Sequence, residues 1–423
     1  MERIYLETYG CSLNFADTAT MAGILKKEGY EITKNIEESN LIILNTCALK
    51  NTLEEEFKKR LKELPQKPLI IAGCIPQSRY GKLKELKDIS LIGTHQISRI
   101  GEIVEETLNG NIVILLAEDQ KDQLNLPHIR ENNLIEIIPI SAGCKGNCTF
   151  CINKLTRGKL HSYNPELIIK RVKYAIQQGV KEIWITSQDI GDYGLDINTT
   201  LPELLTQLIE IKGDYQIKLD NINPNHMWRY LDELISIFKS NKIFKYLHIP
   251  LQSGNDEVLK NMNRKYSAKD WINIVKKFRE EIPEITIATD IICGFPGETE
   301  VQFRDTVYLI EKHEPDILNI SRFWKRQGTL ASKMKQLNEF EIKKRTSWLT
   351  RSFEWISFQR NKKWINWEGN ILINKKIQDN EWEGRNNSYK QITIKGNYKI
   401  NQKIKVKIAH TTINDLRAIE IKK

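Results

Sequence analysis

The sequence lacks an apolar run long enough to cross a membrane, and it lacks a recognisable export signal. Its longest apolar runs, such as LIIL and LIIAG, have the length of a β-strand, whereas a membrane-spanning helix needs about 20 apolar residues. The first ten residues, MERIYLETYG, contain neither an extended apolar core nor a small-residue cleavage site. We therefore expect a cytoplasmic protein that has no membrane partner.

Cysteine is scarce, with 7 residues among 423, and no tract of the chain is of low complexity. Since no export signal is present, we expect a reducing compartment in which thiols bind metals or take part in catalysis rather than form disulfides. The length favours about three domains, and a hydrophobic content of 40% supplies ample core.

Acidic residues are outnumbered by basic ones, mainly near the C-terminal end. The chain has a formal net charge of +10, and residues 361–423 hold 14 Lys and Arg against 6 Asp and Glu, a net +8. Such a segment favours a polyanionic partner, because its cations neutralise phosphates. A solvated basic face without a partner fits the charge equally well.

Residues 1–114 contain strand-like apolar runs that alternate with amphipathic helical segments. The clearest runs are RIYLETYG, LIILN and PLIIAG, and a fourth strand–helix unit follows from Ile89. This alternation predicts a parallel sheet covered by helices, and therefore an N-terminal α/β domain.

One cysteine follows each of the first three predicted strands: Cys11, Cys47 and Cys74. The carboxyl ends of parallel strands meet at one edge of a sheet, which is where open α/β sheets build their sites. We therefore expect the three thiols to gather at that edge. The alternative is three unrelated cysteines that pack in the core.

Residues 115–131 are polar and irregular and indicate a linker, after which the strand–helix alternation resumes within residues 131–360. The six predicted strands are residues 135–141, 181–187, 216–222, 245–251, 285–293 and 316–323. Six units predict a partial (β/α)6 barrel, and an open sheet is the competing arrangement.

Residues 361–423 have a different texture from the rest of the chain. A basic, Trp-rich helix at residues 339–363 leads into short alternating stretches that Gly and Asn interrupt. This pattern predicts a small C-terminal β-barrel of the oligonucleotide-binding kind. The predicted fold class is thus α/β, with domains at residues 1–114, 131–360 and 361–423.

The stretch GCKGNCTFC places Cys144, Cys148 and Cys151 at the carboxyl end of the first strand of the predicted barrel. Three thiolates do not fill a tetrahedral zinc site, for which His161 is the nearest candidate fourth ligand. An iron–sulfur cube held by three cysteines leaves one iron open, where an amine and a carboxylate of a small molecule can chelate. Phe150 can supply an apolar wall beside such a cluster.

The CX3CX2C spacing with its aromatic residue resembles the signature of the radical S-adenosylmethionine (SAM) superfamily. The wider pattern resembles the methylthiotransferase family within it, including that family's C-terminal RNA-binding TRAM domain. The segments that carry this resemblance, in chain order, are ETYGCSLNFAD, NTCALK, AGCIPQ, CTFCINKLTRGKLHS, TSQDIGDYG, HIPLQSGND, MNRKY and DIICGFPGET.

The detail INKLTRGKLHSY is most similar to the archaeal and eukaryotic branch of the family. That branch acts on N6-threonylcarbamoyladenosine at position 37 of tRNA, so the resemblance implies the anticodon loop as partner and the 2-methylthio derivative as product. The sequence names neither the electron donor nor the sulfur donor.

The resemblance also implies the cofactors. Cys144, Cys148 and Cys151 would hold a 4Fe-4S cluster that binds SAM, and Cys11, Cys47 and Cys74 would hold a second 4Fe-4S cluster for sulfur transfer. A second SAM would supply the methyl group. No catalytic residue beyond the cluster ligands is implied, because the cofactors carry the radical chemistry.

Further candidate contacts lie after the predicted inner strands. Candidate cofactor-binding residues are Ser187, Gln188, Asp189, Gln252, Ser253, Gly294 and Gly297. Simple loop capping is the alternative for the polar ones, and the glycines also suit an ordinary turn. Arg157 is a candidate substrate contact, because a guanidinium binds phosphate or carboxylate in bidentate fashion; a salt bridge within the chain is the alternative. Cys293 is expected to pack in the core.

Two other functions remain open at this point. The same chemistry serves relatives that modify isopentenyladenosine in tRNA or an aspartate of a ribosomal protein. A protein of another class, a non-catalytic RNA-binding protein with structural iron–sulfur centres, would bind RNA without turnover. The open iron that the spacing implies argues against this second class.

Overall fold

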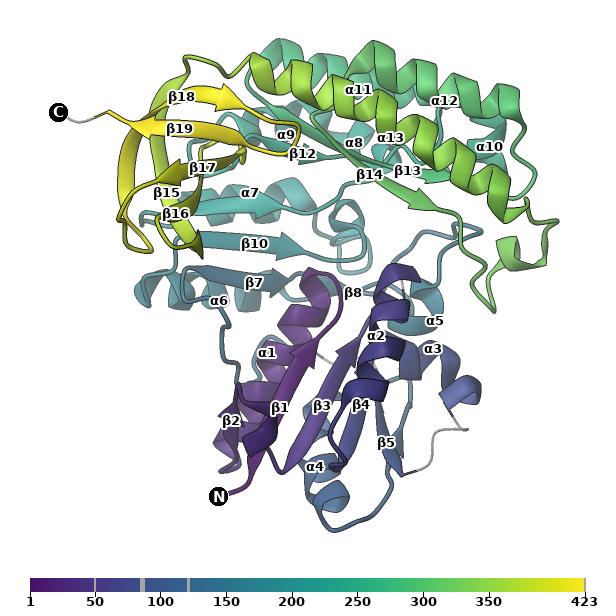
Figure 1. Cartoon of the computed structure of the whole chain (residues 1–423), viewed down its shortest axis with the longest axis vertical. Coiled ribbons are helices and arrows are strands. Elements are labelled where there is room, and N and C mark those ends of the chain that lie inside the picture. The colour runs from purple at the N-terminus through teal and green to yellow at the C-terminus, as the bar shows by residue number, and fades with distance from the viewer. Residues whose placement is uncertain (49–50, 84–87, 120–121, 422–423) are drawn as a thin grey trace. The chain divides into compact units, whose positions relative to one another are not determined.

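The structure is a computed structural model that describes residues 1–48, 51–83, 88–119 and 122–421. The chain forms two compact units, of which the first comprises residues 1–147 and 151–204 and the second comprises residues 148–150 and 205–423. Figure 1 labels the helices and strands for which the view leaves room. Among the described residues, no helix combines the length and the apolar character needed to cross a membrane.

The first unit begins with a six-stranded parallel sheet in the order β2-β1-β3-β4-β5-β6. Its strands are β1 (Arg3–Thr8), β2 (Glu31–Thr33), β3 (Leu41–Thr46), β4 (Leu69–Gly73), β5 (Ile89–Gly93) and β6 (Ile114–Leu115). Its helices are α1 (Ser12–Lys27), α2 (Asn51–Glu63), α3 (Cys74–Leu83) and α4 (Ile100–Leu108). The predicted N-terminal parallel sheet is confirmed; the short strands β2 and β6 were not predicted.

The central strands β3 and β4 are buried along their whole length. Ile43 and Ile70 join one hydrophobic cluster, and Ile42 and Ile71 join a second one. Because successive residues of a strand point to opposite faces, these are the cores on the two faces of the sheet. Burial on both faces explains why these strands read as unbroken apolar runs.

The first unit continues with the parallel pair β7 (Ile135–Pro139) and β10 (Glu182–Thr186). Between them lie the pair β8 (Ser141–Ala142) and β9 (His161–Ser162), and the helices α5 (Asn153–Arg157) and α6 (Pro165–Gln177). The predicted linker packs closely on α1, since a Cβ at Gly23 would lie 2.3 Å from the backbone nitrogen of His128.

The second unit contains the other four strands predicted for the central domain. These are β11 (Gln216–Leu219), β12 (Tyr246–His248), β13 (Thr286–Cys293) and β14 (Ile317–Arg322), and β12, β13 and β14 pair in parallel. The accompanying helices are α7 (Leu201–Glu210, shared between the units), α8 (Pro224–Met227), α9 (Leu231–Phe238), α10 (Asp256–Asn261), α11 (Ala268–Glu281), α12 (Glu300–His313) and α13 (Glu339–Lys362). All six predicted strands of this region are therefore present.

The chain ends in a closed five-stranded barrel in the order β15-β16-β17-β19-β18. Its strands are β15 (Glu368–Gln378), β16 (Glu381–Arg385), β17 (Gln391–Lys395), β18 (Lys403–Thr411) and β19 (Leu416–Glu420). Along β18, Ile404, Val406 and Ile408 are buried in the barrel core. The lysines that alternate with them point outward, as the two-residue period of a strand requires. The predicted C-terminal β-barrel is confirmed.

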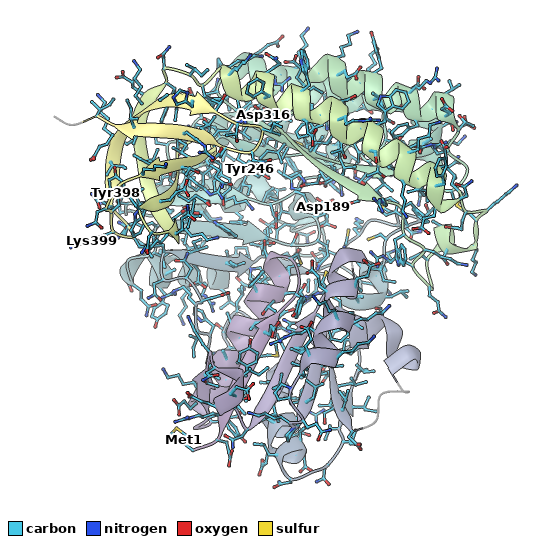
Figure 2. The ribbon with its side chains drawn as sticks, in the orientation of Figure 1. Met1, Asp189, Tyr246, Asp316, Tyr398 and Lys399 are labelled. Carbon is cyan, nitrogen blue, oxygen red and sulfur yellow. The ribbon has the colours of Figure 1, made fainter. Side chains whose placement is uncertain are left out.

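Asp316, before β14, ties α13 and the β-barrel to the sheet of the second unit (Figure 2). Its carboxylate accepts hydrogen bonds from Arg360 at 3.0 Å and from Lys390 at 3.2 Å, and it accepts the backbone N–H of Ile287 at 3.0 Å. Burial alone would raise the pKa of Asp316, but Lys390 and Arg360 hold it below its usual value.

Replacement of Asp316 by alanine should lower the free energy of unfolding by about 3–5 kcal/mol, because it leaves buried cations unpaired. Since the folded-state pKa of Asp316 is depressed, its contribution is complete above about pH 4 and is lost as the pH falls below that value. Urea denaturation at pH 7 and pH 3.5 measures both effects. Asp379→Ala, which removes an exposed partner of Lys376, should leave the urea midpoint unchanged; equal midpoint shifts for the two variants would contradict this role of Asp316.

Candidate metal centres

The cysteines of the first group lie at one edge of the N-terminal sheet. Cys11 is the N-cap of α1 directly after β1, Cys47 follows β3, and Cys74 opens α3 directly after β4. Strands β1, β3 and β4 are parallel neighbours, so the three residues follow the carboxyl ends of adjacent strands. Cys47 and Cys74 are buried, whereas Cys11 is exposed.

Two buried asparagines fix the backbone at this edge. Asn14 donates through its side chain to the carbonyl of Thr46 at 3.1 Å, and Asn45 donates to the carbonyl of Asn14 at 2.8 Å. Gly73 has a φ of +94°, and a Cβ there would lie 2.3 Å from Oδ1 of Asn45. These contacts lock the turns after β1, β3 and β4 together, because each buried amide is held by its neighbours.

A buried ion pair lies beside the same cysteines. Arg157, at the end of α5, donates to Oδ2 of Asp17 on α1 at 2.6 Å, and their side chains are only 8% and 6% exposed. Burial would lower the pKa of Arg157, but Asp17, Cys74 and Cys11 keep it well above its usual value. The predicted substrate-contact residue is thus paired within the chain, and it keeps its positive charge next to two cysteine thiols.

The loop after β8 carries Cys144, Cys148 and Cys151. The thiols of Cys144 and Cys151 interact electrostatically, and each sulfur faces a backbone N–H donor. The N–H of Gly146 lies 3.2 Å from Sγ of Cys144, and the N–H of Asn153 lies 3.5 Å from Sγ of Cys151. Backbone donors of this kind stabilise negative charge on cysteine ligands.

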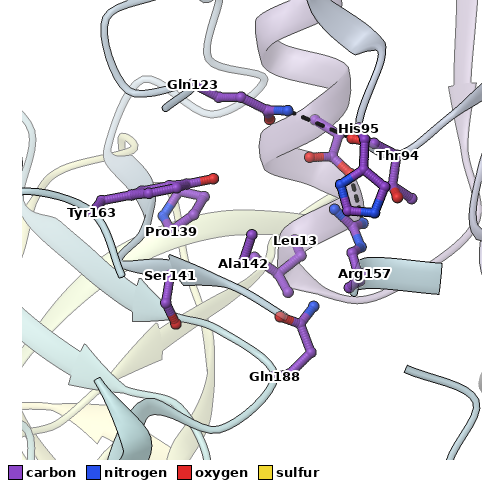
Figure 3. A pocket seen from close by; sticks show the side chains of 11 residues that line it. Leu13, Thr94, His95, Gln123, Pro139, Ser141, Ala142, Arg157, Tyr163 and Gln188 are labelled. Atoms are coloured by element: carbon purple, nitrogen blue, oxygen red, sulfur yellow. Dashed lines mark hydrogen bonds and ion pairs between the residues drawn. The ribbon is translucent and has the colours of Figure 1, made fainter. Parts of the chain in front are cut away.

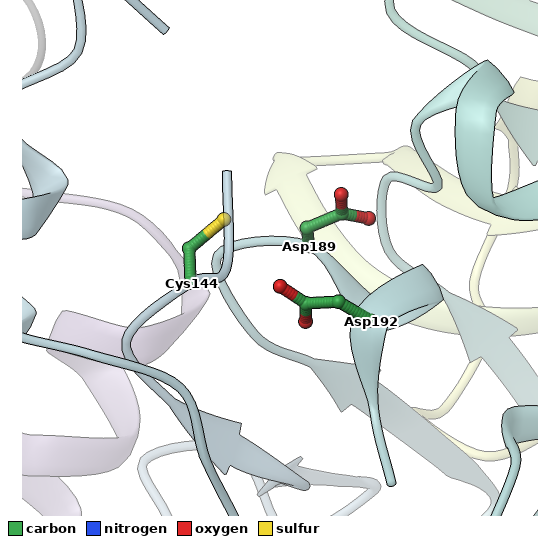
Figure 4. Close-up of side chains that lie close together, drawn as sticks. All are labelled: Cys144, Asp189 and Asp192. Atoms are coloured by element: carbon green, nitrogen blue, oxygen red, sulfur yellow. The ribbon is translucent and has the colours of Figure 1, made fainter. Parts of the chain in front are cut away.

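Two carboxylates approach Cys144 from the loop after β10 (Figure 4). One ligand atom each from Cys144, Asp189 and Asp192 lies within 4.8 Å of the others. Burial raises the pKa of Cys144, and the two carboxylates raise it further.

Two of the predicted cofactor contacts, Ser187 and Asp189, form hydrogen bonds within the loop after β10. Ser187 accepts the N–H of Asp189 at 3.1 Å, and Asp189 accepts the N–H of Gly191 at 3.0 Å. Both side chains therefore cap their own loop.

Cys148 has a guanidinium partner within the second unit. Nη1 of Arg264 donates to Sγ of Cys148 at 3.0 Å, and Nε of Arg264 donates to the hydroxyl of Tyr266 at 2.9 Å. That hydroxyl lies 2.9 Å from the carbonyls of Pro250 and Leu251, and the guanidinium also donates to Asn223. The arginine is thus held in place by Tyr266 and Asn223 as well as by Cys148.

The other predicted contacts of the second unit lie at the ends of β12 and β13. Gln252 adopts a φ of +73°, which is rare for a residue with a side chain and is often associated with function. Ser253 lies 3.3 Å from the hydroxyl of Thr306. Gly294 has a φ of +79°, and a Cβ there would lie 2.6 Å from Ile342 of α13. Gly297 has a φ of +84° with open space around it.

Two apolar residues near these loops differ in burial. Phe150 packs against a cluster that includes Met262 and Phe295. Cys293 is fully buried at the end of β13, and burial raises the pKa of its thiol to about 12. Its burial agrees with the expected packing role.

A small cavity of about 20 Å³ lies within the first unit (Figure 3). Arg157 and Gln188 both line it, so the structure brings these two predicted residues together. Leu13 and Ala142, each two residues from a cysteine of interest, also line it. Residues that lie close in the chain to Cys11 and to Cys144 therefore line the same cavity.

Sequence reasoning missed several side chains at these sites. Asn14, Asn45, Asp17 and Arg264 each lie within or beside a quoted motif, but no periodicity or spacing marks them as contacts. His248, 3.0 Å from the carboxylate of Asp290, was missed in the same way. All five residues lie within the quoted sequence motifs, and this membership is the signal that could have identified them as candidate contacts.

Comparisons with known proteins bear on this arrangement. A family model described as the radical SAM superfamily matches residues 138–310, and one described as uncharacterized protein family UPF0004 matches residues 3–93. A probable threonylcarbamoyladenosine tRNA methylthiotransferase of Pyrococcus horikoshii is 40% identical over 397 residues, which cover 93% of each chain. The human threonylcarbamoyladenosine tRNA methylthiotransferase is 40% identical over 403 residues, which cover 93% of this chain and 69% of the human one. This chain belongs to the threonylcarbamoyladenosine tRNA methylthiotransferase family.

The resemblance predicted from the sequence motifs is thereby confirmed. Among solved structures, the radical SAM methyltransferase TsrM from Kitasatospora setae, with cobalamin and a 4Fe-4S cluster bound, superposes with a TM-score of 0.57 at 12% identity. The match covers 78% of this chain and 77% of TsrM. At this identity the likeness concerns the fold alone, and with the N-terminal parallel sheet and the C-terminal barrel it confirms the predicted fold class.

Two 4Fe-4S clusters and SAM are the cofactors of this methylthiotransferase family. The donor set of this chain fits two such clusters. In the group formed by Cys144, Cys148 and Cys151, the sulfurs accept hydrogen bonds from backbone N–H groups and from Arg264. The group formed by Cys11, Cys47 and Cys74 lies at one edge of the N-terminal sheet, with the buried Arg157 beside it. Cationic and N–H groups next to sulfur offset the negative charge of thiolate ligands.

Measurement of the iron content of cysteine variants tests whether each of the two cysteine groups holds a cluster. The reconstituted wild type should hold about eight irons, because each cube holds four. Replacement of Cys144, Cys148 and Cys151 by alanine should leave about four, and replacement of Cys11, Cys47 and Cys74 should do the same. Cys293→Ala is the matched control and should retain about eight; a loss of iron in that variant alone would contradict the assignment.

Replacement of Arg264 by alanine should lower the reduction potential of the cluster that Cys148 is expected to ligate. The N–H···S bond and the positive charge favour the reduced cluster, so their loss should shift the midpoint by some tens of millivolts. A redox titration followed by electron paramagnetic resonance, in the Cys11, Cys47 and Cys74 triple variant, reports this cluster alone. Arg304→Ala, which breaks a surface ion pair, serves as control; equal midpoints for both variants would show that Arg264 does not act on the cluster.

Proposed function

We propose that this chain methylthiolates C2 of N6-threonylcarbamoyladenosine at position 37 of tRNA, giving the 2-methylthio derivative. The observation that carries the proposal is the 40% identity to threonylcarbamoyladenosine tRNA methylthiotransferases along 93% of the chain. Two cysteine groups at the loops expected for two clusters support it. We also propose a cytoplasmic location, which the sequence predicts.

We assign the domains as residues 1–114, 131–360 and 361–423, and the ligands accordingly. Cys144, Cys148 and Cys151 would hold the cluster that binds SAM, and Cys11, Cys47 and Cys74 would hold the second cluster. When bound, these groups supply the one-electron chemistry that breaks an unactivated C–H bond and the sulfur that replaces the hydrogen.

Side chains of the protein would position the cluster ligands, offset the negative charge of the clusters and leave room for SAM. Arg264 would hold Cys148 in position through its hydrogen bond. Arg157 would offset negative charge beside Cys11 and Cys74, while Asp17 fixes its orientation. Gln252 and the glycines of the loop after β13 would let backbone groups approach SAM closely.

The C-terminal barrel has the surface that an RNA partner needs. Lys403 and Lys405 of β18 are exposed, and Lys395 and Lys399 add exposed charge near β17. Together with the net +8 of residues 361–423, this surface favours binding to the phosphates of tRNA. We propose the anticodon loop as the region that reaches the clusters.

An anaerobic assay tests the proposal directly. The reconstituted protein, SAM, a strong reductant and threonylcarbamoylated tRNA should yield 5′-deoxyadenosine and the 2-methylthio nucleoside, measured by liquid chromatography and mass spectrometry. Parallel assays with isopentenyladenosine-containing tRNA and with ribosomal protein should yield neither product. Tight RNA binding without 5′-deoxyadenosine would instead favour a non-catalytic binding protein and would refute the proposed function.

A further inference from the structure

A second, much larger cavity of about 840 Å³ lies in the first unit. Residues of α1, β1, β7, β10, α6 and the segment before β7 line it. Its volume lies within the range of about 300–1,000 Å³ that is typical of small-molecule and cofactor sites. Unlike the small cavity of Figure 3, it contains none of the residues predicted as cofactor contacts.

One end of this cavity carries an excess of positive charge. Glu136 of β7 is 1% exposed, and Arg130, Arg171 and His128 lie 2.5, 2.7 and 3.3 Å from its carboxylate. Burial alone would raise the pKa of Glu136, but the hydrogen bond from His128 and the charge of Arg171 hold it at about 2. One carboxylate therefore faces two guanidinium groups and an imidazole, and all four side chains line the cavity.

The other charged side chains around the cavity do not cancel this excess. Glu7 pairs with Arg60 at 3.0 Å, and Asp17 pairs with Arg157 at 2.6 Å. Lys34 and Glu131 are exposed and opposite in charge. The net charge at the Glu136 end is thus at least +1, which suits a bound oxyanion.

Aromatic side chains form part of the walls of the same cavity. Phe15 of α1 lines it and is 37% exposed. Tyr5, Tyr163 and Trp184 also line it. Aromatic faces stack on nucleobases with little dependence on base identity. Apolar aromatic walls with a cationic end therefore match a nucleoside that carries a negatively charged group.

The large cavity continues toward the cysteine loops. Asp17, Gln123, Pro139 and Tyr163 line both the large cavity and the small one. The small cavity is in turn bordered by Leu13 and Ala142. A ligand in the large cavity would thus have its far end next to the segments that hold Cys11 and Cys144.

We propose that the large cavity binds the target nucleoside of the RNA, with its aromatic walls against the base and Arg130 and Arg171 facing an oxyanion. This inference rests on the proposed function. The oxyanion is either the carboxylate of the threonyl group or a phosphate of the RNA backbone, since both present oxygen atoms to a guanidinium.

Binding measurements on the full-length, cluster-reconstituted protein without reductant test this site. The probes are anticodon stem-loops that carry either N6-threonylcarbamoyladenosine or plain adenosine at position 37, with affinity read by fluorescence anisotropy. Arg130→Gln should weaken binding of the modified stem-loop about tenfold, while Arg130→Lys should weaken it less. Arg99→Gln, which breaks an exposed pair with Glu102, is the matched control.

The two stem-loops distinguish the source of the oxyanion. A loss confined to the modified stem-loop identifies the threonyl carboxylate, and an equal loss for both identifies a phosphate. Unchanged iron content of Arg130→Gln verifies folding, which we expect because Glu136 keeps Arg171 and His128. Should Arg130→Gln bind both stem-loops as tightly as Arg99→Gln does, the site is refuted.

The aromatic wall provides an independent variant. Phe15→Leu should weaken binding of both stem-loops about fivefold or more, because base stacking is lost; unchanged binding would also refute the site. No turnover occurs in this assay. A failed activity assay alone would therefore contradict the proposed function, whereas weakened RNA binding in these variants would still support the cavity as a nucleoside site.

Discussion

Parallel pairing of β1, β3 and β4 is the constraint on which the rest of the first unit depends. Parallel neighbours end at the same edge, so Cys11, Cys47 and Cys74, which follow these strands, lie along one edge of the sheet although 36 and 27 positions separate them in the chain. Strands β3 and β4 are buried on both faces, which fixes their register, because a slip by one residue would exchange the two faces.

Buried polar groups hold the turns at these strand ends in place. Asn14 and Asn45 lock the turns after the strands, and the Arg157–Asp17 pair keeps a charge near the thiols. Such groups are costly to bury and are retained only when each has its partner. Arg264 follows the same logic at Cys148, where Tyr266 and Asn223 hold the guanidinium. The proposed roles in charge compensation rest on this pre-positioning.

The inferred nucleoside cavity and the basic barrel would serve RNA recognition at different scales. Exposed lysines that alternate along β18 offer a sequence-independent contact to phosphate. The cavity near Glu136 combines stacking surfaces with a localised positive charge, which suits one nucleoside. A protein that modifies a single base within a large RNA needs both kinds of contact.

The sequence by itself determined the parallel N-terminal sheet, the six strands of the central region, the closed basic barrel and the two groups of cysteines. These features could be predicted because local hydrophobic periodicity, short residue spacings and short sequence motifs indicate them. Only the tertiary structure decided the partners of Arg157 and Arg264, the amide contacts of Asn14 and Asn45, and the cavity around Glu136. Those contacts join residues up to 140 positions apart, and no local pattern encodes which distant side chains will meet once the strands and helices have packed.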